Sequence, residues 1–158
     1  MKRISFLCMS FLVIYSWASL KAQDVLQGKI VYVSDGDTYH IILSNSEKER
    51  IRLADVDCPE KSQAFGLEAK EFVANMINGK TVSITKYYVD HYERIIASVN
   101  IDGKDVATEL VSSGLAWHYK RYSDNEDLSN LEKEARQKGL GLWADPDPLA
   151  PWEYRKKK

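Results

Sequence analysis

Alternating apolar and polar residues in the first third of the chain predict β-strands. In Arg50-Ile51-Arg52-Leu53 a period of two places both arginines on one face and both aliphatic side chains on the other. Two clusters of turn-forming residues, at 35–37 and 45–46, interrupt the alternation, as turns between antiparallel strands do. The pattern predicts a three-stranded meander with strands at residues 25–33, 38–43 and 50–53.

The spacing of apolar residues becomes helical between Ala64 and Ile77, and Asn78-Gly79 ends that segment. Alternation then returns, and later segments ending in glycine predict helices again. These expected elements are strands at 81–88 and 94–101 and helices at 105–114 and about 127–139. A helix between the third and fourth of five strands is the arrangement of the OB-fold. The chain is therefore expected to be a β-barrel with α-helices (α+β), a five-stranded OB-fold barrel plus three helices.

The N-terminal segment has the pattern of a secretory signal peptide. Two basic residues precede an apolar run from Ile4 to about Trp17, and a small-residue site ends at Ala22. A transmembrane anchor is the alternative, but the run is shorter than the roughly 20 apolar residues that a bilayer crossing needs. We expect residues 1–22 to be removed, with cleavage after Ala18 as a variant. The remaining residues, 23–158, would then form one exported domain, periplasmic or extracellular and without stable membrane insertion.

Removal of this segment changes the composition of the chain. Cys8 is lost, so Cys58 is the only cysteine left and no internal disulfide is expected. Three of the 22 basic residues and none of the 23 acidic residues are lost, which takes the net charge from −1 to −4. Because proteins that merely coat nucleic acid are usually basic, this charge favours a localised, metal-assisted site. The basic run Arg155–Lys158 is expected to be a solvated tail, with electrostatic steering as the alternative.

Two carboxylates lie where strands of the predicted meander end. Asp37 leaves the first turn and Asp57 follows the third strand, so the fold is expected to bring them together. Two carboxylates, a backbone carbonyl and waters suit Ca²⁺, which prefers oxygen ligands in an irregular shell. Zinc is disfavoured because Cys58 stands alone and the histidines lack ligand spacing. Taken singly, an Asp-Gly-Asp sequence is more often a turn than a metal site.

Arg52, Arg94 and Glu60 add the groups that phosphodiester hydrolysis needs. Guanidinium groups bind the equatorial oxygens of a phosphate, whose charge grows in the transition state. A carboxylate beside a metal can accept a proton from attacking water or hold that water in line. The alternatives are ordinary ion pairs for the arginines and a favourable charge near a helix start for Glu60.

Taken together, these motifs resemble the staphylococcal nuclease (thermonuclease) family. The order and spacing match over roughly residues 25–145, which is nearly the whole chain after the signal peptide. The matching motifs are Asp35-Gly36-Asp37-Thr38, Arg52 to Glu60, Gly66-Leu67-Glu68-Ala69, Asp90-His91-Tyr92-Glu93-Arg94, Gly114-Leu115-Ala116 and Gly141-Leu142-Trp143.

The resemblance implies a role for each matching residue. It assigns Ca²⁺ binding to Asp37, Asp57 and the backbone carbonyl of Cys58, and it assigns Glu60 to the attacking water. It also implies that Arg52 and Arg94 clamp the phosphate. By the same resemblance, Asp35 orients metal-bound water. Many family members have threonine or alanine at the position of Cys58, a change that leaves a backbone ligand intact.

The loop before Arg94 and the aromatic segments bear on substrate binding. Glu93 stands where the family usually has glycine, so a positive φ there would mean strain or a changed turn, with consequences for Arg94. Tyr92 matches a family tyrosine near the phosphate and base. Tyr119 and Tyr122 are expected either to stack on a base or to pack in the core. Trp117, Trp143 and Trp152 are interpreted as structural.

The expected activity is that of an endonuclease or endo-exonuclease. The resemblance implies a Ca²⁺-dependent hydrolase acting on DNA and RNA with little sequence specificity and leaving 3′-phosphates; no protein partner is evident. One alternative is a catalytically silent OB-fold module that binds nucleic acid. Another is a calcium-stabilised envelope protein, which would account for the acidic residues but not for the arginines.

Overall fold

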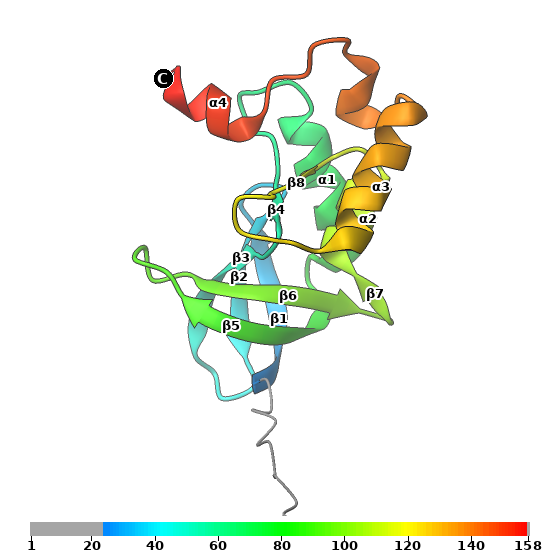
Figure 1. Cartoon of the computed structure of the whole chain (residues 1–158). Coiled ribbons are helices and arrows are strands. Elements are labelled where there is room, and N and C mark those ends of the chain that lie inside the picture. The colour runs from blue at the N-terminus through cyan, green and yellow to red at the C-terminus, as the bar shows by residue number, and fades with distance from the viewer. Residues whose placement is uncertain (1–23, 158) are drawn as a thin grey trace, which may run out of the picture.

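The computed structural model describes residues 24–157. The predicted signal peptide, residues 1–22, lies outside the described residues. Figure 1 shows a β-barrel with helices gathered at one end of it and the C-terminal helix at the upper left of the view. None of the helices in the described part of the chain has the length and apolar character needed to cross a bilayer.

Five strands close into the predicted barrel. They follow the order β3-β2-β1-β5-β6, and a parallel pairing of β3 with β6 closes the sheet. In that closing pair Ile51 lies opposite Ile95 and Leu53 opposite Ala97. The prediction of an OB-fold barrel is therefore confirmed. The strands are β1 Asp24–Val33, β2 Thr38–Leu43, β3 Lys48–Leu53, β5 Thr81–Val89 and β6 Ile95–Ile101, and the short β7 Lys104–Asp105 extends the sheet beside β6.

Alternation along the strands fills the barrel. Every second residue of β2 and β6 is buried, so these strands send one set of side chains inward. Tyr39, Ile30, Ile51 and Ile84 are among the largest fully buried side chains of this core. Register shifts interrupt β1 between residues 30 and 32 and β5 between residues 86 and 88; such bulges bend strands as a closed barrel requires.

Three helices cover one end of the barrel, close to their predicted positions. They are α1 Gly66–Ile77, α2 Val106–Ser112 and α3 Glu126–Gln137. Helix α1 begins two residues later than expected because Phe65 has a left-handed backbone, φ 64°. Asp105 caps α2 by accepting a hydrogen bond from the Thr108 amide at 2.8 Å, and Asn125 caps α3 in the same way.

Besides β7, the sequence patterns miss four short elements. β4 Val56–Asp57 pairs with β8 Trp117–His118, a 3₁₀-helix spans Gly141–Ala144, and the helix α4 Pro151–Lys156 ends the described chain. The expected solvated tail is therefore wrong for Arg155, which belongs to α4. Trp152 of the same helix stacks on Tyr119 with ring centroids 5.2 Å apart, and this contact docks α4 beside β8.

Candidate active site

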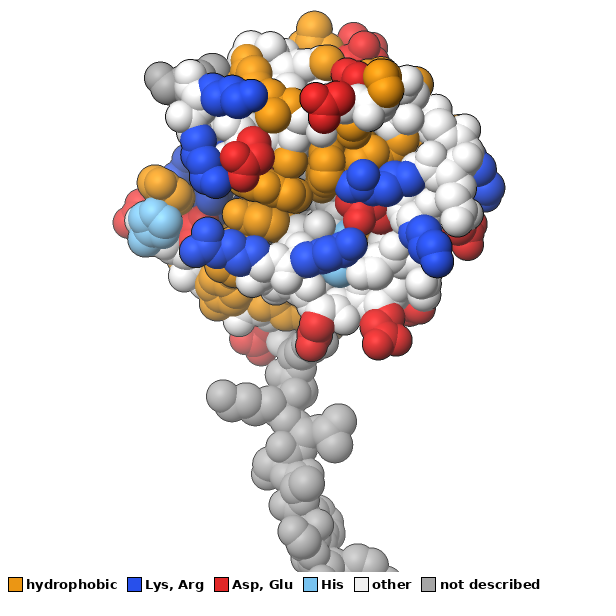
Figure 2. All heavy atoms as spheres, turned by 45° about the horizontal axis from the view of Figure 1, so that its top comes forward, with side chains coloured by type: hydrophobic (Ala, Val, Ile, Leu, Met, Phe, Trp, Pro, Cys, Tyr) orange, Lys and Arg blue, Asp and Glu red, His pale blue; other side chains and the backbone are white. Residues whose placement is uncertain are grey.

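A cavity of about 930 Å³ collects the predicted site residues at one end of the barrel. Its lining includes side chains from the β1–β2 turn, from β3 and β4, from the β5–β6 hairpin and from α4. Figure 2 shows a face on which Lys and Arg side chains gather around hydrophobic side chains. Sequence-distant segments thus contribute acidic, basic and aromatic groups to one open pocket.

One wall of the cavity consists of two buried carboxylates and the arginine that pairs with them. We call these three residues, Asp37, Asp57 and Arg52, the acidic wall. Asp37 is 6% exposed and Asp57 is 1% exposed. A single nitrogen, Arg52 Nη2, lies 3.3 Å from Asp37 Oδ2 and 2.9 Å from Asp57 Oδ1. The Cys58 amide donates to Asp37 Oδ2 at 2.8 Å, which brings the Cys58 backbone to the same place. The two carboxylates therefore come together as the sequence predicts.

Arg52 is fixed by backbone as well as by carboxylates. Its Nη1 donates to the carbonyls of Leu53 at 2.7 Å and Val56 at 2.9 Å. Burial lowers the pKa of Arg52, but the charges of Asp37 and Asp57 outweigh it and raise the pKa above its ordinary value. The guanidinium therefore remains charged and keeps one orientation.

The turn before Asp37 packs tightly and carries a further acid. Asp35 Oδ1 accepts a hydrogen bond from the Asp37 amide at 3.2 Å. Burial, followed by the charge of Asp37, raises the pKa of Asp35 to about 6. A Cβ on Gly36 would lie 2.8 Å from Cys58 Cβ, so this turn requires glycine for close approach. The hydroxyl of Tyr39 donates to the Gly36 carbonyl at 2.7 Å and fixes the turn from the core.

Glu60 lies at the rim of the cavity and pairs with Arg155, a residue that the sequence pattern predicts to lie in a solvated tail. Arg155 Nη1 donates to Glu60 Oε1 at 2.9 Å. Its fork also contacts both oxygens of Asp57, with Nη2 at 2.7 Å from Oδ2 and Nη1 at 3.2 Å from Oδ1. Pro151, a favoured first residue of a helix, was the available sequence signal for α4.

The β5–β6 hairpin also lines the cavity, and a local turn there holds Arg94. Asp90 Oδ1 accepts from the Tyr92 and Arg94 amides at 2.9 Å each. Asp90 Oδ2 accepts from Arg94 Nε at 2.9 Å and lies 2.7 Å from Nη2. Glu93 has φ 61°, so the turn keeps the left-handed conformation with a non-glycine residue, the strained outcome foreseen from the sequence. Arg94 nevertheless lines the same cavity as Arg52.

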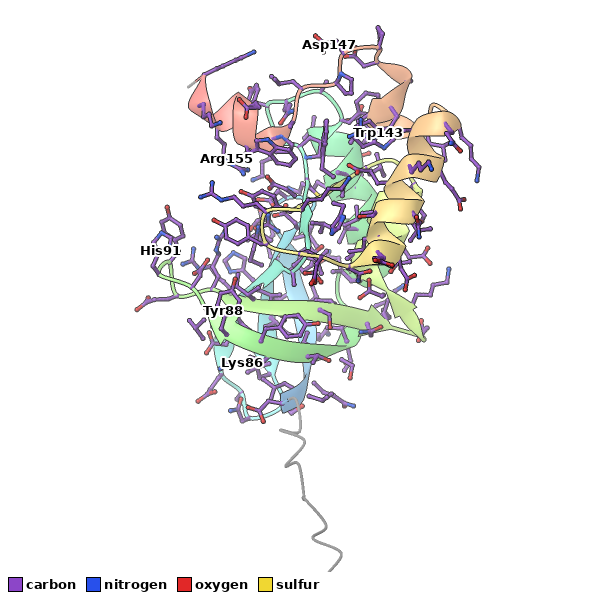
Figure 3. The ribbon with its side chains drawn as sticks, viewed as in Figure 1. Lys86, Tyr88, His91, Trp143, Asp147 and Arg155 are labelled. Atoms are coloured by element: carbon purple, nitrogen blue, oxygen red, sulfur yellow. The ribbon has the colours of Figure 1, made fainter. Side chains whose placement is uncertain are left out.

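The predicted stacking tyrosines lie around the cavity but differ in freedom. Tyr92 and Tyr122 are 59% and 64% exposed, with His91 against the Tyr92 ring and the edge of Tyr119 against Tyr122, whereas one face of Tyr119 is covered by Trp152. Tyr87 and Tyr88, which the sequence interpretation did not single out, also line the cavity and are exposed. Their β5 segment contains the register shift, which breaks the alternation that would otherwise separate neighbouring side chains. Figure 3 shows Tyr88 and His91 on this hairpin.

The three tryptophans interpreted as structural pack together. Trp117 makes edge contacts with Trp143 and Trp152, at centroid distances of 4.5 and 5.4 Å. The guanidinium of Arg136 lies 3.5 Å from the Trp143 ring centroid. The cluster joins α3, the 3₁₀-helix and α4, so it supports the end of the molecule that carries Arg155.

Comparison with known proteins identifies the family to which this chain belongs. Residues 50–145 match the family described as Staphylococcal nuclease homologue. An "Uncharacterized endonuclease" of Escherichia coli is 39% identical over 148 residues, 93% of this chain and 95% of that protein. The chain belongs to the staphylococcal nuclease family. It is also similar to an "Uncharacterized endonuclease" of Haemophilus influenzae, which is 34% identical over 94% of this chain and 84% of the relative. A "Micrococcal nuclease" of Shigella flexneri is 35% identical over 87% of this chain and 85% of that protein.

The family match covers part of the cavity. Arg52, Asp57, Glu60 and Arg94 lie within the matched residues, whereas Asp37 precedes them. The helix α4 with its arginine follows them. The extra arginine therefore stands outside the segment by which the staphylococcal nuclease family is recognised.

The donor chemistry of the acidic wall suits a hard cation. Among residues 24–157, no group of three or more His, Cys, Asp or Glu side chains is arranged as a ready metal site. Two guanidinium groups instead occupy oxygens of Asp57, the most buried of these carboxylates. Burial raises the pKa of Asp57 despite its hydrogen bonds to arginine, as expected for acids crowded away from water. The carboxylates of Asp37 and Asp57 are oxygen donors of the kind that a calcium ion takes.

Cys58 and His91 line the cavity, and His118 is buried on β8, the strand that pairs with β4. Burial, followed by the charge of Asp37, raises the pKa of the Cys58 thiol well above its ordinary value, so this group is held as a neutral thiol. His118 is buried and its two ring nitrogens lie 2.9 and 3.0 Å from the hydroxyls of Ser129 and Ser123. That zinc is disfavoured stays a prediction from the sequence.

Proposed function

We propose that this chain is an exported, Ca²⁺-dependent phosphodiesterase that hydrolyses DNA and RNA with little sequence specificity and leaves 3′-phosphates. The general class, a nuclease, is supported by the family and by relatives named as endonucleases. The observation that carries the proposal is the meeting of Asp37, Asp57, Glu60, Arg52 and Arg94 around one cavity. These five groups supply acids for a cation, an acceptor for a proton and cations for a phosphate.

Asp37, Asp57 and the Cys58 carbonyl are the groups that would hold Ca²⁺. When bound, the ion would supply positive charge that polarises the phosphodiester and water beside it. Asp35, hydrogen-bonded to the Asp37 amide, is placed to orient a water next to these ligands. Arg52 balances the same acids and keeps them at a fixed spacing before substrate arrives.

Glu60 is the proposed acceptor for the proton of the attacking water. Its side chain is 37% exposed at the rim, so water can reach it. The water oxygen attacks phosphorus, its proton passes to a Glu60 carboxylate oxygen, and the bond from phosphorus to the 5′ oxygen breaks. The departing oxygen gains a proton from water, and the phosphate remains on the 3′ side.

Arg52 and Arg94 would stabilise the phosphate during this step. The equatorial oxygens gain negative charge in the transition state, and planar guanidinium groups can donate two hydrogen bonds at once. The two arginines come from neighbouring segments, Arg52 from β3 and Arg94 from the residue that precedes β6, the strand paired with β3. A phosphate in the cavity would be within the reach of both guanidinium groups.

Exposed tyrosines would bind the strand without reading its sequence. Tyr92 and Tyr122 offer ring faces beside the phosphate site, and stacking on aromatic rings accepts every base. Unpaired bases reach such rings more readily than paired ones, so flexible or single strands should be preferred. No base-specific contact is required by this arrangement.

Incubation with supercoiled plasmid DNA tests the proposal. Calcium should produce fragments, a chelator should prevent them, and Asp37→Ala should abolish the calcium response while the protein still folds. Asp124→Ala, an exposed acid outside the cavity, is the matched control and should cut normally. End-group analysis of the products should find 3′-phosphates. Calcium-independent binding of DNA without fragments would instead support the silent nucleic-acid-binding module. A protein that neither binds nor cuts DNA would support the calcium-stabilised envelope protein.

Export is proposed from the sequence of residues 1–22. Fractionation of cells that express the whole chain should find the protein in the periplasm or medium, with its N-terminus at residue 23. Retention of the uncleaved chain in the membrane would support the anchor alternative. Replacing Ala22 with a bulky residue should slow processing without changing the folded domain.

A further inference from the structure

Arg155 contacts both carboxylates to which the proposed function gives the metal and the attacking water. Its two terminal nitrogens form a fork on Asp57, and one of them also donates to Glu60. Figure 3 shows Arg155 below α4, on the side that faces the barrel. Burial lowers the pKa of Arg155, but its hydrogen bonds to Asp57 and Glu60 outweigh the effect of burial and raise the pKa above its ordinary value. The residue is therefore a charged member of the cavity.

Helix α4 does not depend on Arg155 for its position. Trp152 stacks on Tyr119 at an interplanar angle of 5° and meets the edge of Trp117. The Tyr154 hydroxyl donates to the Ser62 carbonyl at 3.0 Å, on the loop before α1. The helix is thus anchored by its aromatic residues, and the Arg155 side chain can change partner while α4 stays docked.

Arg155 and a cation compete for the same oxygens. Asp57 Oδ2 accepts from Arg155, and Oδ1 accepts from both Arg155 and Arg52. A divalent ion on Asp57 would repel a guanidinium held against the same carboxylate. One of the two arginines must then give way.

The structure indicates which arginine yields. The Arg52 side chain is 13% exposed and is tied to two backbone carbonyls, whereas the Arg155 side chain is 42% exposed and its hydrogen bonds among the described residues go to the carboxylates of Asp57 and Glu60. A long, half-exposed side chain on a surface helix changes rotamer at lower cost than a buried one bonded to backbone. Arg155 is therefore the movable group.

A displaced Arg155 remains beside the place where a phosphate would bind. It lines the same cavity as Arg52 and Arg94, and its Glu60 partner stands at the rim. Arg94 is already occupied by Asp90 through Nε and Nη2. A planar fork released from Asp57 is the least restrained guanidinium available to phosphate oxygens.

We propose that Arg155 is a third phosphate-binding arginine that neutralises Asp57 and Glu60 until a calcium ion takes its place on Asp57. This inference rests on the proposed function and deepens it. It predicts an unusual combination of effects for loss of the side chain: tighter binding of Ca²⁺ together with slower cleavage. A merely structural ion pair would weaken or leave unchanged the affinity for the ion.

Calcium titration of the exported protein in the absence of nucleic acid tests the first half. Calorimetry should give about fivefold tighter Ca²⁺ binding for Arg155→Ala than for wild type, since the competing ion pair is lost. Arg155→Lys, which keeps the charge without the fork, should fall between them. Lys156→Ala removes the neighbouring charge of α4, which pairs with Glu153 instead, and is the matched control. Thermal melting of each variant verifies that it folds.

Cleavage of a single-stranded oligonucleotide at saturating Ca²⁺ tests the second half. Arg155→Ala should lower kcat/KM at least tenfold, with Arg155→Lys intermediate and Lys156→Ala close to wild type. The inference is overturned if Arg155→Ala binds Ca²⁺ no more tightly than Lys156→Ala, or if it cuts as fast as wild type. A wild-type protein that binds Ca²⁺ but never cuts would overturn the proposed function itself.

Discussion

The acidic wall and the β5–β6 hairpin each present an arginine to one cavity, but they hold it by different means. Arg52 comes from the closed barrel, is buried, and bonds to two backbone carbonyls and two carboxylates. Arg94 comes from a surface turn, pairs with Asp90 four residues earlier and lies over the Tyr92 ring, 5.3 Å from its centroid. The first arrangement depends on the whole fold, whereas the second is built within five residues.

This difference separates stability from chemistry. Removing Arg52 would leave buried Asp37 without its counterion and Asp57 with Arg155 alone, so folding and activity should fall together. Removing Arg94 would leave Asp90 with the backbone amides of its own turn as partners, so activity should fall largely alone. A pair of substitutions can therefore show which wall belongs to the scaffold and which belongs to the substrate site.

The largest effect is expected for Arg52→Ala. Buried Asp37 and Asp57 would repel each other, and chelator-treated protein should lose about 3 kcal/mol of unfolding free energy, measured by urea denaturation. The rate of DNA cleavage should fall about 10³-fold, because a phosphate contact is lost as well. Adding Ca²⁺ should restore part of the stability but not the rate. An unchanged denaturation midpoint would mean that Arg52 does not balance these acids.

Arg94→Ala should separate the two properties. We expect kcat to fall about 10²-fold, while the unfolding free energy changes by less than about 1 kcal/mol. Steady-state kinetics on a short oligonucleotide and urea denaturation on the same sample provide the comparison. Near-normal turnover would mean that the strained turn before Arg94 presents a different group to the phosphate.

Asp90→Asn should have a smaller effect that isolates positioning. Asparagine keeps the oxygen that accepts from the backbone amides of the turn, but it removes the charged oxygen that holds Arg94. We expect a roughly tenfold loss in kcat/KM with the fold intact, because the guanidinium loses its fixed orientation. Faster cleavage would show that Asp90 restrains Arg94 rather than presenting it.

The same comparison explains how much the sequence could predict. Period-two patterning placed all five barrel strands, and the meeting of strand ends correctly brought Asp37 and Asp57 together. Such features depend on local alternation and on neighbouring strands, both of which are visible in a single sequence. The contact of Asp90 with Arg94 is also local, although the pattern alone did not identify it.

The part of the cavity that was missed depends on distant contacts. Helix α4 has only six residues, and its position comes from rings of residues 117 and 119, far back along the chain. No periodicity in a short basic segment could reveal that stacking, so Arg155 was expected in solvent. Tyr87 and Tyr88 were missed for another reason, because a register shift in β5 alters the alternation.

The smallest effect is expected for Glu93→Gly, which relaxes the hairpin without touching the acidic wall. A left-handed backbone costs a non-glycine residue about 1 kcal/mol or more, and the greater freedom of glycine in the unfolded chain offsets part of that relief. The unfolding free energy should therefore rise by about 0.5 kcal/mol, seen as a Tm increase of about 1–2 °C, with turnover unchanged. Glu93→Ala removes the same side chain but keeps the strained conformation. If alanine stabilises as much as glycine, the carboxylate rather than the backbone is the source of the strain, and the turn holds Arg94 at no conformational cost.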